Sequence, residues 1–93
     1  MINEQQKNTI IRTLNPYSPK SIGIFGSFAR NENNHNSDLD ILVDFTGKVN
    51  LLDIIGMEQD LTEEIGIKVD LVTKNALSHR LEQSVLKDLQ IIY

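Results

Sequence analysis

Apolar residues recur along this sequence in two patterns, as short dense runs and as stripes with helical spacing. The dense runs are bounded by glycine or by polar residues, which is typical of strands in a small sheet. They occupy residues 21–25, 38–45 and 68–73. The stripes predict amphipathic helices before, between and after these strands. They occupy residues 3–14, 50–65 and the stretch that begins at residue 75.

Polar residues mark the ends of the first two long helices. Asn3 is placed to cap the first helix, and Gln6 can reach back to it in a capping box. Pro16 follows the helix and cannot continue it. Asn50 is expected to cap the second long helix, and Gly66 to end it. The apolar stripe of that second helix consists of Leu51, Ile54, Ile55, Met57, Leu61 and Ile65. Glu58 falls inside this stripe, and the pattern alone gives no reason for it.

The end of the chain is predicted as a helix capped by Asn75. The residues expected to share its apolar side are Leu77, Leu81, Val85 and Leu89. Residues 90–93 can finish either as helix or as a short edge strand. With a short helix at 26–30, helices and strands alternate along the chain. This order predicts an α/β (α+β) fold in which helices pack on a small sheet.

Length and composition narrow the class of protein. A chain of 93 residues has room for one domain, spanning residues 1–93. The net charge of −4 weighs against general nucleic-acid binding, which favours a basic surface. There is no cysteine, so disulfides and thiolate zinc sites are excluded. The polar first residues and the lack of a long apolar run predict a cytoplasmic protein without a signal peptide or membrane span.

Three aspartates lie within the predicted strands. Asp38 and Asp40 are two positions apart, so both side chains leave one face of the strand, about 6.5–7 Å apart at Cα. Asp70 lies between Val69 and Leu71 in another apolar strand, where aspartate is uncommon. Most acidic pairs belong only to a solvated surface. If the two strands are neighbours, however, three carboxylates meet, and a divalent cation such as magnesium would relieve their repulsion.

A second motif follows the first dense run, which leads directly into Gly26 and Ser27. Glycine allows the backbone to approach a ligand, and the start of a helix offers free N–H groups to phosphate. The alternative is structural, with Gly26 making a turn and Ser27 acting only as a helix cap. Arg30, one turn further, is a candidate phosphate or partner ligand that can equally pair with Glu32 or with another surface acid.

Taken together, the motifs resemble the polymerase-β type nucleotidyltransferase superfamily. The segments GSFAR at 26–30 and SDLDILV at 37–43 are similar to those of the minimal nucleotidyltransferase (MNT) family. The resemblance extends from about residue 10 to residue 93 and implies a small mixed β-sheet packed with helices. One departure is Asn31, where the family often has glycine, although asparagine also tolerates a left-handed turn.

The resemblance also implies the roles of the motifs. Gly26 and Ser27 would hold the triphosphate of ATP, and Asp38, Asp40 and Asp70 would bind the magnesium ions, of which we expect two. Arg30 is kept as a further candidate ligand of the triphosphate because of its position. Many such small proteins are antitoxins paired with a HEPN-type ribonuclease toxin, and they resemble enzymes that transfer AMP from ATP to a tyrosine hydroxyl of the toxin. A hetero-oligomer with such a partner is therefore expected.

Two other functions stay open at this point. The chain could neutralise a toxin by covering it, without catalysis, although a complete set of acids weighs against a decayed site. It could also act on RNA or on a small molecule with a partner subunit, since the chain itself has no second domain to shape such a substrate. We expect Asp44 either to support the three metal-binding aspartates without touching the ligand or to lie at the surface. We expect His35 to lie in a solvated loop.

Overall fold

The computed structural model describes residues 1–93 and contains a four-stranded sheet with strand order β3-β2-β1-β4. Strand β1 pairs antiparallel with β2 and β4, and β2 pairs parallel with β3, so the sheet is mixed. The strands are β1 (Pro19–Phe25), β2 (Leu39–Phe45), β3 (Val69–Thr73) and β4 (Gln90–Ile91). The helices are α1 (Glu4–Leu14), α2 (Gly26–Ala29), α3 (Leu51–Ile65) and α4 (His79–Asp88), with 3-10 turns η1 (Asn15–Tyr17) and η2 (Lys74–Ala76). The predicted α/β fold with a small mixed sheet is confirmed.

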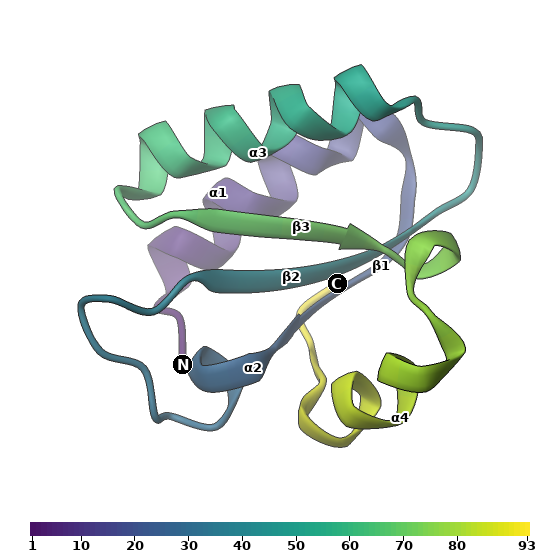
Figure 1. Cartoon of the computed structure of the whole chain (residues 1–93). Helices are drawn as coiled ribbons and strands as arrows, with labels where there is room; N and C mark the ends of the chain where they lie inside the picture. Colours follow the sequence, from purple (N-terminus) through teal and green to yellow (C-terminus); the bar gives the residue numbers. More distant parts are fainter.

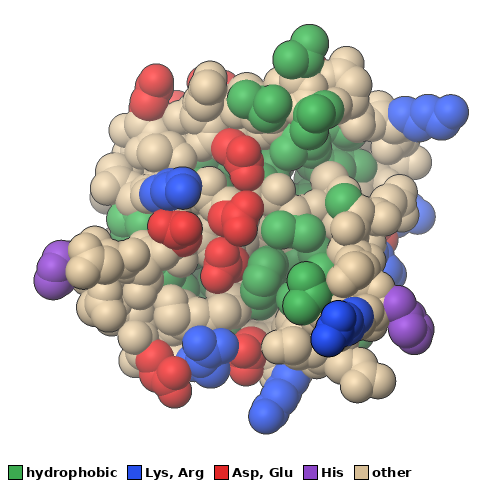
Figure 2. Space-filling model, viewed as in Figure 1, with side chains coloured by type: hydrophobic (Ala, Val, Ile, Leu, Met, Phe, Trp, Pro, Cys, Tyr) green, Lys and Arg blue, Asp and Glu red, His purple; other side chains and the backbone are tan.

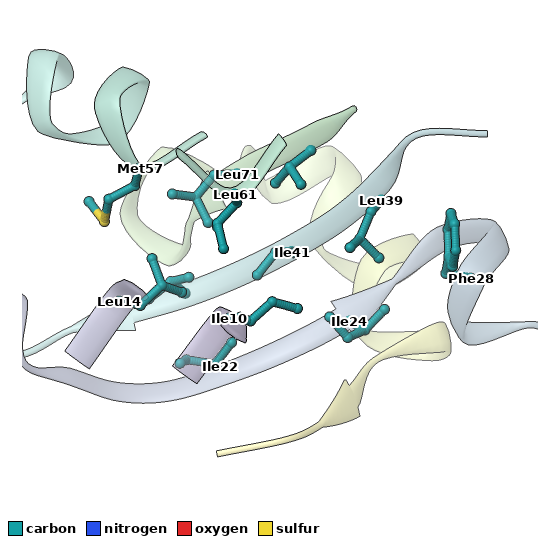
Figure 3. Packing of buried hydrophobic residues seen from close by; sticks show 12 residues of the cluster. Ile10, Leu14, Ile22, Ile24, Phe28, Leu39, Ile41, Met57, Leu61 and Leu71 are labelled. Carbon is teal, nitrogen blue, oxygen red and sulfur yellow. The ribbon is translucent and has the colours of Figure 1, made fainter. Parts of the chain in front are cut away.

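Helices α1 and α3 lie side by side over one face of the sheet, whereas α2 and α4 lie near its other side (Figure 1). The core fills the space between the sheet and the helix pair (Figure 3). Its fully buried residues include Ile10, Leu14, Ile22, Ile24, Leu39, Ile41, Val43 and Leu61. Since strand side chains alternate in direction, the residues between these positions on β1 and β2 lie on the opposite face. That opposite face carries Asp40.

The helix ends that the sequence predicted are present. The Asn3 side chain accepts from the Gln6 N–H at 2.8 Å, and the Gln6 side chain accepts from the Asn3 N–H at 2.9 Å. The Asn50 side chain accepts from the Asp53 N–H in the same way. Gly66 ends α3 in a left-handed conformation with φ +79°. The two asparagine caps satisfy N–H groups at the helix starts, whereas the Gly66 N–H donates to the Thr62 carbonyl at the end of α3.

The predicted cap at Asn75 is wrong. Asn75 lies inside the 3-10 turn η2, which Thr73 caps, and α4 begins later with Ser78 as its N-cap. Serine caps a helix as well as asparagine does. Leu77 is extended and separates η2 from α4. The predicted apolar side of this helix is also too long. Leu77 and Leu89 flank the helix, Leu81 is 57% exposed, and Val85 is the buried member.

The apolar stripe of α3 is buried over a shorter length than predicted. Met57 and Leu61 are buried, but Leu51 is 73% exposed. Helix α3 runs antiparallel to β3, with Thr62 beside Val69. One helical turn spans about the same length as two strand residues, so residues before about 54 extend beyond the last residue of β3.

The end of the chain forms the short edge strand β4 on the outer side of β1, which was one of the two expected outcomes. The predicted strands otherwise agree with the observed ones to within two residues. No helix is long and apolar enough to cross a bilayer.

Candidate active site

Asp40 and Asp70 are register partners on the adjacent parallel strands β2 and β3. Partners in a parallel pair direct their side chains to the same face, and neighbouring strands are about 4.8 Å apart. Asp38 lies immediately before β2, two residues from Asp40. The sequence-based expectation that strands from separate parts of the chain bring Asp40 and Asp70 together is therefore confirmed as geometry. Figure 2 shows acidic side chains gathered near the centre of this face.

The electrostatics of Asp40 reflect this crowding. The pKa of Asp40 is raised to about 6, first because the side chain is partly buried and then because the charges of Asp70 and Asp38 are close to it. Arg30 opposes the shift, but with a smaller effect. An ionised Asp40 is thus costly in the protein alone and becomes favourable when positive charge lies beside it.

The three carboxylates lie near one another without converging on a single point. No three Asp, Glu, His or Cys side chains are gathered closely enough to hold an ion in their present rotamers. Asp38 instead points toward Lys68, with 3.9 Å between Oδ2 and Nζ. Like charges repel, so uncompensated carboxylates turn apart. Carboxylate oxygens are nevertheless the ligands that magnesium prefers, and the raised pKa of Asp40 marks a place where a cation is favourable.

Gly26 lies against Asp40 at the start of α2. Its φ is +72°, and a β-carbon at this position would overlap Asp40 Oδ2 and lie 3.2 Å from Asp40 Cγ. Phe25, the residue before it, is the register partner of Asp40 on β1. The turn after β1 therefore closes directly onto the acidic site, and only glycine fits there.

Ser27 follows in the first turn of α2. The alternative reading of Ser27 as the N-cap is wrong, because the cap position is Phe25 and no side chain caps this helix. The first N–H groups of α2 thus have no side-chain acceptor, next to the carboxylates. A backbone donor group beside an acidic, cation-favouring cluster is suited to a phosphate chain that carries magnesium.

A family model described as a nucleotidyltransferase domain matches residues 5–92 of this sequence. The chain belongs to the nucleotidyltransferase domain family. The chain is accordingly classed as a nucleotidyltransferase enzyme.

Curated relatives and solved structures agree with this assignment. A protein from Methanocaldococcus jannaschii is 46% identical over 74 residues, which cover 78% of this chain and 76% of the relative. Its name describes it as a candidate protein adenylyltransferase. The protein adenylyltransferase MntA of Thermococcus cleftensis is 40% identical over 72 residues, covering 77% of this chain and 73% of MntA. A crystal structure described as a toxin-antitoxin with AMP-PNP has a TM-score of 0.86 and 27% identity, covering 94% of this chain and 72% of that one.

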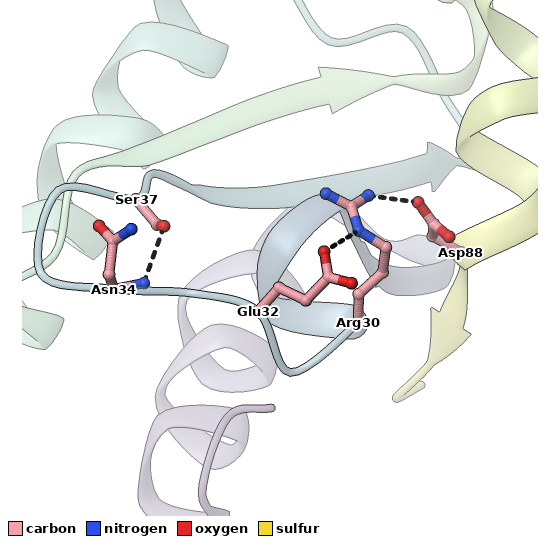
Figure 4. Close-up of polar contacts among 5 residues, drawn as sticks. All are labelled: Arg30, Glu32, Asn34, Ser37 and Asp88. Carbon is pink, nitrogen blue, oxygen red and sulfur yellow. Dashed lines mark hydrogen bonds and ion pairs between the residues drawn. The ribbon is translucent and has the colours of Figure 1, made fainter.

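In this nucleotidyltransferase, Arg30 is held by two carboxylates. Its Nη1 donates to Asp88 at 2.6 Å and its Nε donates to Glu32 at 3.1 Å (Figure 4). The hydrogen bond to Asp88, followed by that to Glu32, raises the pKa of Arg30. Pairing with Glu32 or another acid was one of the two predicted possibilities, but the sequence did not single out Asp88, because it is 58 residues away. Asn31 adopts the left-handed conformation with φ 57°, as expected for a residue replacing glycine.

His35 and Asp44 lie around the acidic site. A cleft of about 600 Å³ next to Asp38 is lined by the asparagine-rich loop that contains His35. Asp44 is four residues beyond Asp40 on β2 and faces Lys74, with 3.9 Å between the charged atoms. Its position matches the predicted surface role.

Glu58 and Thr62 are the residues whose role the sequence did not reveal. The Glu58 carboxylate accepts from the Leu71 N–H at 2.7 Å, and the Thr62 hydroxyl accepts from the Val69 N–H at 3.0 Å. The two residues thus bind β3 on either side of Asp70. The available signal was their spacing, since they are polar residues one helical turn apart on a helix that packs on a strand.

Proposed function

We propose that this chain transfers AMP from ATP to a tyrosine hydroxyl of a cognate HEPN-type toxin in the cytoplasm, and so acts as an antitoxin. The observation that carries the proposal is the register pairing of Asp40 with Asp70 beside the turn at Gly26. The relatives named as protein adenylyltransferases support a protein acceptor. The similar structure with AMP-PNP is a toxin-antitoxin, which supports ATP as the donor and a toxin as the partner in a hetero-oligomer.

The reaction we propose is an in-line displacement at the α-phosphorus. The acceptor oxygen forms a bond to this phosphorus while the bond to the bridging oxygen of the β-phosphate breaks, and pyrophosphate leaves. Positioning and electrostatics supply most of the acceleration in reactions of this kind. Asp70 comes from a different strand than Asp38 and Asp40, and its exposed side chain is the one we assign to receive the proton of the attacking hydroxyl.

Two magnesium ions fit the donor set that we propose, with Asp38, Asp40 and Asp70 as ligands. Bound there, magnesium would supply the positive charge that stabilises the attacking and leaving oxygens. The N–H groups at the start of α2, with Ser27, would hold the triphosphate, and Arg30 would add a charged contact once it is released from Asp88. Gly26 keeps the backbone close enough for this contact.

The test uses the native chain, its cognate partner, magnesium and ATP labelled at the α-phosphate. We expect label to move to the partner, and the double variant Asp38→Ala with Asp40→Ala to transfer none. The matched control is Asp44→Asn, which removes a carboxylate from the same strand beyond the acidic site and should transfer label normally. Equal transfer by the double variant would overturn the proposal. A variant without the acids that still silenced the partner would support neutralisation by covering instead.

A further inference from the structure

Strand β3 is an edge strand, and its free edge is bound by side chains of α3 rather than by another strand. The Leu39 N–H donates to the Lys68 carbonyl at 2.8 Å, so the backbone of residue 68 is directed toward β2. Backbone groups alternate along a strand, so Asp70 is directed toward β2 as well, whereas Val69 and Leu71 are directed outward. Their outward N–H groups would otherwise be free at the edge.

Glu58 and Thr62 match these two outward N–H groups in spacing. Two residues on a strand span about 6.6 Å, and four residues on a helix rise about 6 Å. A helix lying antiparallel to the strand can therefore present side chains four positions apart to N–H groups two positions apart. The bonds from Leu71 to Glu58 at 2.7 Å and from Val69 to Thr62 at 3.0 Å show this arrangement, and both are partly buried.

We propose that Glu58 is a positioning residue for the nucleotidyltransferase reaction, with Thr62 as its second support, because the two fix the backbone on both sides of Asp70. Asp70 is the one acid of the site on an edge strand, so β2 restrains it from one side only. The hydrogen bond of Glu58 supplies the restraint on the other side. A displacement of about 1 Å at a reacting group can lower a rate about 100-fold, so this restraint matters to activity.

The role requires an oxygen acceptor at Glu58 and not its charge. Glu58→Gln keeps an acceptor oxygen of the same reach, whereas Glu58→Ala removes it. Thr62→Ser and Thr62→Val form the corresponding pair at the second support. Glu63→Ala is the matched control, because it removes a glutamate from the exposed side of the same helix where no hydrogen bond to β3 is made.

Part of the experiment does not depend on catalysis. Amide hydrogen exchange of Leu71 is measured by NMR, and Mn²⁺ binding to the chain alone is titrated by EPR. We expect faster exchange at Leu71 and weaker Mn²⁺ binding in Glu58→Ala, with native behaviour in Glu58→Gln and Glu63→Ala. Unchanged exchange and Mn²⁺ binding in Glu58→Ala would overturn the inference, whether or not the chain adenylylates a partner.

The kinetic part rests on the proposed function. We expect kcat for adenylyl transfer to fall about 10- to 100-fold in Glu58→Ala while KM for ATP changes less than about twofold. Thr62→Val should give a smaller fall, and Glu58→Gln should restore kcat to within about threefold of native. A Glu58→Gln variant as inactive as Glu58→Ala would show that the charge itself is needed, and would overturn a positioning role. If the native chain transfers no label at all, the proposed function fails, and the exchange and Mn²⁺ measurements still decide the role of Glu58.

Discussion

The backbone of Gly26 packs directly against the carboxylate of Asp40. The β-carbon of any other residue at position 26 would overlap Asp40 Oδ2. The turn after β1 and the acid on β2 therefore form one unit. A substitution at either position should therefore alter the conformation at the other.

This relationship predicts that Gly26→Ala abolishes adenylyl transfer. The substitution imposes a left-handed conformation on alanine, at a cost of about 1–2 kcal/mol, and it displaces Asp40. We expect a fall in kcat/KM of at least about 100-fold, measured with labelled ATP and the partner.

Gly66→Ala is the matched control. Gly66 has a similar φ of +79°, but no atom lies within 4 Å of the added β-carbon. It should lose a similar amount of stability in thermal unfolding and keep its activity. If Gly26→Ala and Gly66→Ala lost the same activity, the loss would result from backbone strain. That outcome would contradict a role for the contact between Gly26 and Asp40.

The raised pKa of Asp40 predicts a stability that depends on pH. Folding raises this pKa from about 3.8 to about 6, so the folded protein favours the protonated acid. The contribution of Asp40 to the free energy of unfolding is therefore largest below about pH 4. This contribution is lost as the pH rises from about 4 through 6. Asp40→Asn has no charge to lose and should be more stable than the native chain at pH 7.5, by about 1–2 kcal/mol after allowance for solvent screening.

Thermal unfolding from pH 4 to pH 8 measures this difference. It should be small near pH 4 and grow to a constant value above pH 6.5, with an increase in Tm of about 5 °C. Asp44→Asn provides the comparison on the same strand. A stability difference for Asp40→Asn that does not vary with pH would contradict the raised pKa of Asp40, which results first from its burial and then from the charges of Asp70 and Asp38.

The ion pair between Arg30 and Asp88 predicts a change in ATP affinity. The carboxylates of Asp88 and Glu32 compensate the charge of Arg30. They would compete with a triphosphate for its donors if Arg30 binds ATP as we propose. Asp88→Asn should therefore lower KM for ATP about three- to tenfold, and Arg30→Ala should raise it, both at nearly constant kcat. Steady-state kinetics at two salt concentrations test this, because screening should reduce both effects. An increase of KM in Asp88→Asn would show instead that the pair holds Arg30 in its working position.

Much of this architecture could be predicted from the sequence, because the deciding interactions are local. Asn3 and Asn50 cap helices through residues three positions away, and Gly66 ends α3 by its own conformation. The paired acids were visible because Asp40 and Asp70 interrupt apolar strands. The glycine turn was visible because it follows such a strand directly.

The sequence did not reveal the contacts between residues that are far apart in the chain. Asp88 meets Arg30 only after α4 has folded back beside α2, and Glu58 meets Leu71 only once α3 lies along the edge of the sheet. The predicted cap of α4 was wrong because Asn75 and Ser78 are both residues that cap helices well. The hydrophobic pattern does not show that Leu77, which lies between them, is extended. Sequence patterns thus locate the chemical groups, whereas tertiary contacts determine how they are held.

Ligand binding should stabilise the folded chain through the same carboxylates. A ligand at about 100 times its Kd raises the free energy of unfolding by about 2.7 kcal/mol, and we expect ATP with magnesium to do so in thermal unfolding. EDTA should remove the effect, because ATP alone brings its negative phosphates to Asp38, Asp40 and Asp70 without compensation. The double variant Asp38→Ala with Asp40→Ala should show no stabilisation by ATP and magnesium, whereas Asp44→Asn should behave as the native chain. Stabilisation by ATP that persists in EDTA would mean that the triphosphate is held by Arg30 and the start of α2 alone, and it would remove magnesium from the proposed binding site.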